Sequence, residues 1–503
     1  MISKISMLLL FVVVTVVIAV VCRKRSGEVH DLVLGGRSVG PWISAFAYGT
    51  SYFSAVVFVG YAGQFGWNFG ISATWIGLGN AFIGSLLAWV LLGRRTCVMT
   101  KHLDSATMPD FFAKRYDSKA LQIVTSVIIF IFLIPYSASV YKGLSGLFAL
   151  SFDIDYTYCI IGIAVLTGLY VVVGGYMATA FNDLFQGIIM LVGIVAVIVA
   201  VLNTNGGLMG SIAALSQIPC DTAPELQGAY TSFFGPDLIN LISVVILTSL
   251  GTLGLPQMIH KFYAIKSERS IKAGTVISTV FALVIAGGSY FLGGFGRLFY
   301  APVDGVVAFD NIVPAMLATA LSDVLIGVVL ILVLSASMST LSSLVITSSS
   351  TFTLDFLKGS VMKNMSQKTQ VVLIKVLCAF FVLLSVLIAL NPTNLITSLM
   401  SLSWGTLAGC FLGPFIYGLY WKKTTKASVW VAIIAGVGIN VANLLGAWVS
   451  PTVAGAASMI LSLIIVPVVS LITPKLSKEH VAEMFACYSV KAEVEQKYAI
   501  DEK

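Results

Sequence analysis

The stretch LSASMSTLSSLVITSSST, residues 334–351, places hydroxyl side chains in a segment that otherwise reads as a membrane span. Eleven of the 17 residues from Ser335 to Thr351 are Ser or Thr, and the apolar run DVLIGVVLILVL precedes them directly. Hydroxyl residues in membrane helices commonly bond back to their own helix or join two helices. So dense a run leaves two interpretations, which are packing between helices and binding of a cation.

The composition indicates an integral membrane protein. Of the 503 residues, 58% are hydrophobic and only 10% are charged, whereas soluble domains carry about 25% charged residues. A bilayer-crossing helix needs about 20 mainly apolar residues. We expect thirteen spans, at 5–22, 41–66, 71–93, 119–149, 157–175, 180–202, 236–259, 270–297, 322–352, 370–390, 393–420, 427–448 and 451–473. The short apolar segment 310–319 is expected at the surface.

The basic residues predict the orientation, because Lys and Arg concentrate in cytoplasmic connections. The cluster RKR at 23–25 follows the first span, and the long connection 203–235 contains no Lys or Arg. We therefore expect a plasma or inner membrane protein with its N-terminus outside and its C-terminus in the cytoplasm. The net charge of +7 then reflects topology and gives no reason to expect a nucleic-acid partner.

Two of the spans are interrupted by Gly and Pro at comparable positions, 41–66 by GTSYFS and 236–259 by GTLGLP. A matched pair of broken spans is typical of transporters built from inverted repeats. The predicted organisation, in chain order, is an additional helix with its cytoplasmic loop (1–40), a five-helix repeat (41–202), an extracellular loop (203–235), a second five-helix repeat (236–420), two further helices (421–473) and a cytoplasmic tail (474–503).

The hydroxyl run and the first break are expected at similar depth in the membrane. At 1.5 Å per residue, Ser335 to Ser343 lie roughly 20–30 Å from the outer end of their span, and Thr50 and Phe53 lie roughly 14–18 Å from the inner end of theirs. An unwound helix frees backbone carbonyls, and Ser residues three or four apart share a helix face. Because Ca²⁺ and Mg²⁺ usually recruit carboxylates, such an oxygen set predicts a sodium site.

Six stretches together resemble the sodium:solute symporter family, from about Asp31 to Lys426. They are LGGRSVGPW (34–42), TMPDFFAKRY (107–116), VVGGYMATAFNDLFQG (172–187), GLPQMIHKFYAIKS (254–267), SASMSTLSS (335–343) and GPFIYGLYWKK (413–423). The sodium/proline branch is the most similar and the sodium/pantothenate branch is next. The resemblance implies an all-α membrane protein with 13 transmembrane helices and a leucine-transporter-like core of two inverted five-helix repeats. It also implies Na⁺-coupled symport of a small organic solute, such as the amino acid proline, by alternating access.

The resemblance further implies two sodium sites. The first takes oxygens from Thr50, Phe53, Ala336, Ser339 and Thr340. The second, which only some members have, corresponds to Asp183, Ser339, Ser342 and Ser343. Asp183 could instead cap the N-terminus of the helix 180–202, and the two roles are compatible.

The solute site implied by the family lies beside the two breaks and comprises Tyr52, Ser54, Tyr136, Thr248 and Gly251. Tyr136 could also be an ordinary packing residue with a bonded hydroxyl. Tyr52 stands where the proline branch has an aspartate, and Thr248 stands where it has a tryptophan. Pantothenate, another monocarboxylate or a sugar therefore remain open as solutes. Lys142 could bind a carboxylate, although its long stem could also carry the ammonium to water.

A membrane enzyme, an ion channel and a sodium sensor are the competing classes. The sequence contains no HExxH, GxSxG or Walker A motif, which argues against an enzyme. No segment resembles a selectivity-filter loop, and interrupted repeats favour alternating access. A sensor would need a signalling module, for which the tail 474–503 is short. We expect a carrier that acts as a monomer, with a small solute, sodium ions and the lipid bilayer as partners and Na⁺ as its coupling ion.

Overall fold

The computed structural model describes residues 2–22, 28–221, 224–225, 227–391 and 395–488. The basic cluster 23–25 and the tail residues 489–503 lie outside these ranges. The described residues are almost entirely helical, and their β pairing consists of two isolated bridges, Val39 with Ile265 and Val303 with Val306.

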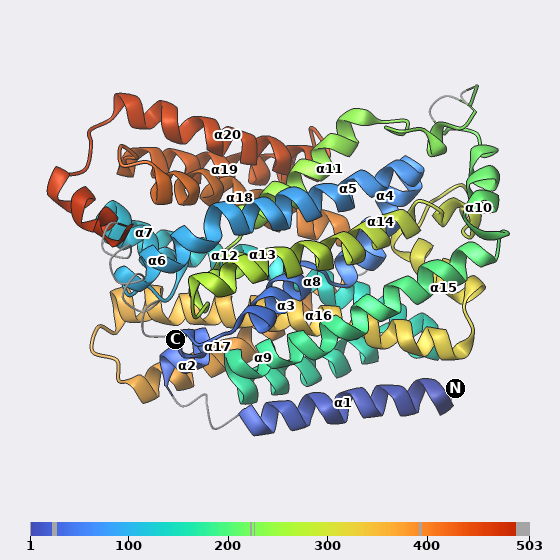
Figure 1. The fold of residues 1–503 in the computed structure, drawn as a ribbon, viewed down its shortest axis with the longest axis horizontal. Helices are drawn as coiled ribbons and strands as arrows, with labels where there is room; N and C mark the ends of the chain where they lie inside the picture. The colour runs from blue at the N-terminus through green and yellow to red at the C-terminus, as the bar shows by residue number, and fades with distance from the viewer. Residues whose placement is uncertain (1, 23–27, 222–223, 226, 392–394, 489–503) are drawn as a thin grey trace, which may run out of the picture.

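The long helices run along one common direction and form a single bundle (Figure 1). One end of the bundle carries the start of α1 (Ile2–Cys22) and helix α10 (Gly207–Ser216), and we call it the loop end. The opposite end carries α6 (Arg94–His102) and α7 (Met108–Tyr116), and we call it the α7 end.

The first half of the bundle opens with a broken span. In chain order its elements are α2 (Val29–Leu34), α3 (Pro41–Tyr52), the π-helical turn Val56–Tyr61, α4 (Ala62–Phe69), α5 (Thr74–Gly79), the π-helical segments Asn80–Leu87 and Trp89–Gly93, α6, α7, α8 (Lys119–Phe152) and α9 (Tyr156–Asn203). Helix α9 is bent at Gly175, whose φ of 62° and ψ of −167° lie outside the helical region. A positive φ favours glycine, so this residue divides α9 into two straight parts.

The second half also opens with a broken span, followed by the remaining helices. Its elements are α11 (Leu238–Leu250), the 3₁₀ turn Gly251–Leu253, α12 (Pro256–Tyr263), α13 (Glu268–Ala282), the π-helical turn Leu283–Gly287, α14 (Gly288–Gly293), α15 (Ile312–Ala320), α16 (Asp323–Thr351), the π-helical end Phe352–Val361, α17 (Gln367–Ala389), α18 (Ile396–Tyr420), α19 (Lys426–Gly446) and α20 (Pro451–Ile472).

Ten helices among the described residues are long and apolar enough to cross a membrane. Residues Ile5–Ile18 and Tyr156–Leu169 form shorter apolar helices, and Val56–His102 runs on as one long helix, so the count of thirteen spans stays a prediction. The segment 310–319 is not among these long helices and exposes Asn311, Ala318 and Thr319, so its expected place at the surface stays a prediction. That segment contains α15, and five of its nine residues are buried because it packs against α4 and neighbouring helices.

Helix α16 lies in the interior and packs against α1, α3, α8, α9 and α17. All eleven hydroxyl residues from Ser335 to Thr351 are buried. The outer helices instead expose large apolar side chains, for example Leu10 of α1 and Leu471 of α20, as lipid-facing helices do. The polar run of α16 therefore faces protein and not lipid.

Candidate ion and solute site

The centre of the bundle contains the break that follows α3. Helix α3 ends at Tyr52, Phe53 is extended with φ −110° and ψ 134°, and helical structure resumes at Val56. The last carbonyls of a helix have no helical donor of their own, so the break leaves backbone oxygens available. The N–H of Ala55 donates to the hydroxyl of Ser337 at 3.0 Å, which ties the break to α16.

Two hydroxyl residues of α16 meet the broken end of α3. The hydroxyl of Thr340 lies 3.1 Å from the carbonyl oxygen of Phe53 and 3.1 Å from that of Ala336. The hydroxyl of Ser339 donates to the hydroxyl of Thr50 at 2.8 Å. The structure thus brings together all five residues predicted for the first sodium site. It adds Ser51, whose carbonyl oxygen lies 3.4 Å from the Thr340 hydroxyl.

The oxygens of the predicted first sodium site are neutral carbonyl and hydroxyl oxygens. Among the described residues, no group of three or more His, Cys, Asp or Glu side chains could hold a metal ion. Neutral carbonyl and hydroxyl oxygens in a buried position suit a weakly held monovalent cation better than Ca²⁺ or Mg²⁺, which usually bind carboxylates.

The residues predicted for a second sodium site lie close to the first. Asp183 of α9 is fully buried, and the hydroxyls of Ser339 and Thr50 are near enough to act on its carboxylate. The hydroxyls of Ser342 and Ser343 donate to the carbonyl oxygen of Ser339, at 2.9 and 3.0 Å. These two serines therefore bond back to their own helix in this structure, as serines in membrane helices commonly do.

The capping role considered for Asp183 is wrong. The straight part of α9 that contains it begins at Gly175, so Asp183 lies about two turns inside the helix. Its carboxylate faces the ammonium of Lys261 on α12, with 3.6 Å between Nζ and Oδ2. Lys261 lies just past the expected end of the span 236–259, yet its side chain is only 3% exposed.

Three of the five predicted solute residues, Tyr52, Tyr136 and Gly251, lie against one unpredicted side chain, Trp404 of α18. The ring of Tyr52 stacks on Trp404 at 5.9 Å, and the ring of Tyr136 meets it edge-on at 5.7 Å. A Cβ at Gly251 would lie 2.9 Å from the Trp404 ring, so glycine lets this ring approach the second break. The hydroxyl of Tyr52 donates to the carbonyl of Thr248 at 2.5 Å, which joins the two breaks directly. We call this region the central chamber.

Several buried groups of the central chamber make no well-aligned hydrogen bond among the described residues. They are the hydroxyl of Tyr136 and Nε1 of Trp404, which lie close together, and the hydroxyl of Tyr290 and Nδ2 of Asn80. Asn80 belongs to this region because its Oδ1 accepts from the Thr248 hydroxyl at 2.8 Å, and Tyr290 lies beside Asn80. The fifth predicted solute residue, Ser54, lies beside the Tyr136 hydroxyl. A buried donor without a partner is costly, and most buried polar groups are bonded. Four such groups in one region suit water or a polar ligand that supplies acceptors.

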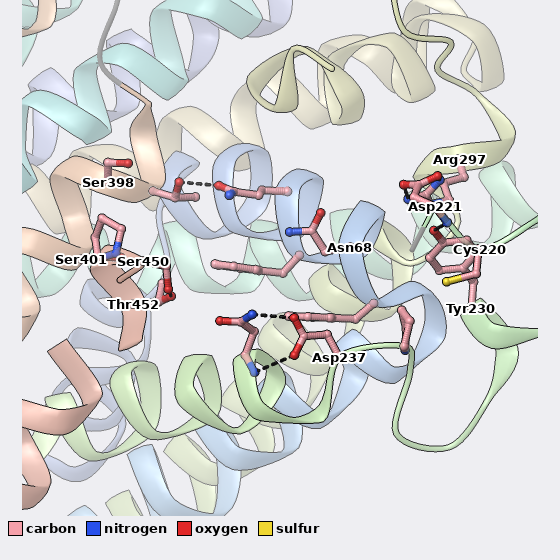
Figure 2. A pocket seen from close by; sticks show the side chains of 17 residues that line it. Asn68, Cys220, Asp221, Tyr230, Asp237, Arg297, Ser398, Ser401, Ser450 and Thr452 are labelled. Atoms are coloured by element: carbon pink, nitrogen blue, oxygen red, sulfur yellow. Dashed lines mark hydrogen bonds and ion pairs between the residues drawn. The ribbon is translucent and has the colours of Figure 1, made fainter. Parts of the chain in front are cut away.

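A cavity of about 330 Å³ opens at the loop end (Figure 2). It lies between α4 and the first turns of α11, α18 and α20, and Figure 2 shows Asn68, Asp237 and Ser401 around it. Beside it, Arg297 forms an ion pair and hydrogen bonds with Asp221, and these hydrogen bonds hold the pKa of Asp221 below its usual value.

The hydroxyls of Tyr61 and Ser401 form a hydrogen bond of 2.8 Å between the residues that line this cavity and those of the central chamber. Ser401 lines the cavity, and Trp404 of the chamber follows it after one turn of α18. On the other side, Phe65 lines the cavity and its ring packs against that of Tyr61 at 5.0 Å.

Lys142 lies away from the central chamber. It lines a separate cavity of about 320 Å³ together with Asp310, Tyr156 and Ile396. Burial raises the pKa of Asp310, and the positive charge of Lys142 opposes that shift. The carboxylate that Lys142 faces therefore belongs to the protein itself.

The model of the sodium:solute symporter family matches residues 32–436 of this chain. A sodium/proline symporter of Staphylococcus aureus is 29% identical over 491 residues, which cover 94% of this chain and 92% of that protein. A sodium/proline symporter of Staphylococcus aureus strain JH9 is 30% identical over 475 residues, which cover 91% and 89%. The chain belongs to the sodium:solute symporter family.

Solved structures show the same fold. A Na⁺-coupled sialic acid symporter in a substrate-bound outward-open state superposes with a TM-score of 0.77 at 17% identity, over 94% of this chain and 99% of that chain. A transporter of the nucleobase-cation-symport-1 family in a closed conformation gives a TM-score of 0.50 at 15% identity, over 91% and 98%. The predicted leucine-transporter-like fold is confirmed.

The protein is therefore a multi-pass membrane symporter that couples transport of a solute to Na⁺. Family and fold are those of transporters and not of enzymes.

Sequence reasoning missed several residues of this symporter's site: Asn80, Trp404, Tyr290 and Lys261. Asn80 carries a recoverable signal, because a polar residue within an apolar run suggests a functional position. Trp404 and Tyr290 carry none, because aromatic residues are common throughout the spans.

Proposed function

We propose that this symporter takes up a small amino acid, with proline favoured, and that the solute binds in the central chamber. The observation that carries the proposal is the group of unpartnered buried donors on Tyr136, Trp404, Asn80 and Tyr290. Four donors suit a carboxylate, which accepts several hydrogen bonds. The rings of Tyr52, Tyr136 and Trp404 suit a compact apolar body next to that carboxylate. The Staphylococcus aureus relatives are named sodium/proline symporters.

For the first sodium ion, we propose oxygen ligands from Thr50, Phe53, Ala336, Ser339 and Thr340. The hydrogen bonds between α16 and the broken end of α3 support this site. With the ion present, the hydroxyls of Ser339 and Thr340 turn their lone pairs toward it instead of donating to neighbouring oxygens.

For a second sodium ion, we propose Asp183 with Ser339, Ser342 and Ser343. The nearness of Ser339 to the buried Asp183 supports it. The hydroxyls of Ser342 and Ser343 bond to the Ser339 carbonyl in this structure. They would have to rotate to face this ion.

Coupling follows from the order of residues at the break. Thr50 and Phe53 belong to the proposed ion site, whereas Tyr52 and Ser54 belong to the proposed solute site. The residues of the two sites alternate between positions 50 and 54, so fixing the conformation of one set also fixes that of the other. An ion that orders Thr50 and Phe53 therefore also positions Tyr52 for the solute, which is the differential interaction that coupling requires.

We propose that the loop end faces the outside, that the N-terminus is outside and the C-terminus cytoplasmic, and that alternating access involves the repeats 41–202 and 236–420. The absence of Lys and Arg from 203–235 supports this orientation. Both proposed sites are built from one chain, so we propose that a monomer is the working unit.

A different carboxylate-bearing solute, such as pantothenate, is the second candidate. Tyr52 and Thr248 favour it, because they stand where the proline branch has an aspartate and a tryptophan. A sugar without a carboxylate would leave the four donors less well matched.

The deciding experiment is counterflow in proteoliposomes with radiolabelled proline, pantothenate, other amino acids, monocarboxylates and sugars. We expect Na⁺-dependent exchange of proline or another small amino acid. Exchange of sugars alone would overturn the proposed solute class, and Na⁺-independent exchange would overturn the proposed ion sites.

A further inference from the structure

The ion pair between Lys261 and Asp183 is buried on both sides. The side chains are 3% and 1% exposed, and Nζ lies 3.6 Å from Oδ2. Hydrogen bonds between an ammonium and a carboxylate are normally about 2.7–2.9 Å long. Neither carboxylate oxygen of Asp183 accepts a short, well-aligned hydrogen bond among the described residues, although the Lys261 ammonium and the Ser339 and Thr50 hydroxyls lie close to it. A buried carboxylate held this loosely is expensive to maintain, so a purely structural role explains the pair poorly.

The pair spans two helices that carry different parts of the transport machinery. Asp183 lies on α9 beside Ser339 and Thr50, at the proposed ion sites. Lys261 lies on α12, which continues from the break that contains Gly251. One turn along each helix, Gln186 and Gln257 are also buried without hydrogen-bond partners. The surroundings of the pair are thus polar but poorly satisfied, as expected where groups change partners.

We propose that the Lys261 ammonium and the second sodium ion compete for the Asp183 carboxylate. This inference rests on the proposed second sodium site and adds a residue that controls its occupancy. One carboxylate balances one positive charge, and two cations beside it in a buried region repel each other strongly. The second ion therefore binds only as Lys261 leaves.

A second partner for the Lys261 ammonium lies nearby. The Lys261 Nζ lies 5.3 Å from the centre of the Tyr176 ring, within the range of a cation–π interaction. Tyr176 is on α9, two turns before Asp183 and toward the α7 end. The flexible four-carbon stem of lysine can move the ammonium from the carboxylate toward this ring without moving the helix.

The exchange links the ion to the second broken helix. Without the second ion, Lys261 holds α12 to α9 by the ion pair. Once Na⁺ binds the Asp183 carboxylate, α12 loses its contact with α9, and α12 is free to shift relative to α9. The arrival of the ion is thereby transmitted to Gly251 and Thr248 at the other side of the central chamber.

The test is binding of ²²Na⁺ to the purified full-length protein, comparing wild type with Lys261→Met and Lys261→Arg. Met removes the charge at similar length, and Arg keeps it. We expect the second ion to bind about tenfold more tightly in Lys261→Met and within about twofold of wild type in Lys261→Arg. A structural role predicts weaker binding or no change in Lys261→Met, so either result would overturn the competition.

Asp183→Asn separates this inference from the function on which it rests. If Asp183→Asn binds as many ions as wild type, the second sodium site itself is wrong. If Asp183→Asn binds one ion fewer while Lys261→Met binds Na⁺ no more tightly, the second site stands and the competition is wrong.

A second pair of variants does not alter either charged residue. Tyr176→Leu removes the ring that receives the ammonium, and Tyr176→Phe keeps it. We expect the second ion to bind several-fold more weakly in Tyr176→Leu and unchanged in Tyr176→Phe. Equal affinities in the two variants would show that the ring does not receive Lys261, and would contradict the proposed movement even if Lys261→Met does not fold.

Discussion

The hydroxyl of Thr340 lies 3.1 Å from the carbonyl oxygen of Phe53, although 287 positions separate the two residues along the chain. The contact joins the hydroxyl-rich interior of α16 to the break after α3. It depends on the break, because a carbonyl inside a continuous helix would be bonded to its own helix. The serine run and the broken helix are therefore two halves of one candidate site.

Thr340→Ala removes one oxygen from the proposed first sodium site. We expect the apparent Na⁺ affinity of transport to fall about tenfold or more, because a lost ligand of this kind is worth about 1–2 kcal/mol. Thr340→Ser keeps the hydroxyl and should stay close to wild type. Sodium titration of solute uptake in proteoliposomes measures both, with K⁺ expected to be inactive. Equal Na⁺ dependence of Thr340→Ala and wild type would remove Thr340 from the site.

Tyr136→Phe removes one of the unpartnered donors of the central chamber. We expect the KM for solute to rise about tenfold, while Na⁺ affinity at saturating solute stays unchanged, because a hydrogen bond to a charged group contributes about 1.5–3 kcal/mol. Stability should change little, since the hydroxyl makes no well-aligned hydrogen bond within the described part of the chain.

Tyr141→Phe is the matched control for this change. Tyr141 lies on the same helix α8, and its buried hydroxyl also makes no well-aligned hydrogen bond to any described residue. Tyr141 is not among the residues of the central chamber, so we expect the Tyr141→Phe variant to have the same KM for solute as wild type. Similar effects of the two substitutions would argue against the chamber as the solute site.

Much of the fold was predictable, because membrane spans depend on length and apolar composition alone. The two breaks were predictable from Gly251, Pro256 and the small residues before Phe53, since these residue types interrupt helices. The buried position of Lys261 was not predictable from the sequence. Lys261 lies just past the expected end of its span, where a lysine normally reaches water, and only tertiary packing reveals Asp183 beside it.

In the candidate site, too, some residues were predictable from the sequence and others were not. The Ser and Thr run drew attention to Ser339 and Thr340 because of its density. Trp404 gave no such signal, although it contacts Tyr52 and Tyr136. Its role follows from the crossing of α18 with α8 and the break, which no local pattern encodes.

Gly66→Ala tests the close contact of α4 with α14. A Cβ at Gly66 would lie 2.1 Å from the carbonyl carbon and oxygen of Gly293, which are backbone atoms that cannot rotate away. We expect a loss of stability of about 1–3 kcal/mol or more from overpacking, visible as a lower Tm in detergent. Gly438→Ala, where no atom lies within 4 Å of the added Cβ, should leave Tm unchanged. Equal Tm values for Gly66→Ala and Gly438→Ala would show that α4 and α14 can move apart without loss of stability.

The Tyr61–Ser401 hydrogen bond should restrain passage between the loop-end cavity and the central chamber. Removing a bond worth about 1 kcal/mol raises the open population about fivefold. We expect Tyr61→Phe and Ser401→Ala each to raise the association rate of labelled solute about fivefold. The double variant should raise that rate no further, because each single variant already removes the bond. Ser398→Ala, which alters the same cavity, is the control. Additive effects would mean that the two hydroxyls act separately.

The last prediction concerns the number of ions, and the membrane potential makes it measurable. At about 100 mV, each Na⁺ contributes about 2.3 kcal/mol, and a tenfold sodium gradient adds about 1.4 kcal/mol per ion. One ion could thus concentrate a neutral solute about 500-fold, and two could reach about the square of that value.

We expect two ions, because Asp183 and the serines beyond Thr340 offer a second set of oxygens. For a neutral solute, a tenfold change in its gradient shifts the reversal potential by about 59 mV with one ion and by about 30 mV with two. Liposome measurements should therefore give the smaller shift for wild type and the larger one for Asp183→Asn. The smaller shift in both proteins would place the second ion elsewhere. A wild-type shift of about 59 mV would leave Ser342 and Ser343 with the packing role that their bonds to the Ser339 carbonyl already indicate.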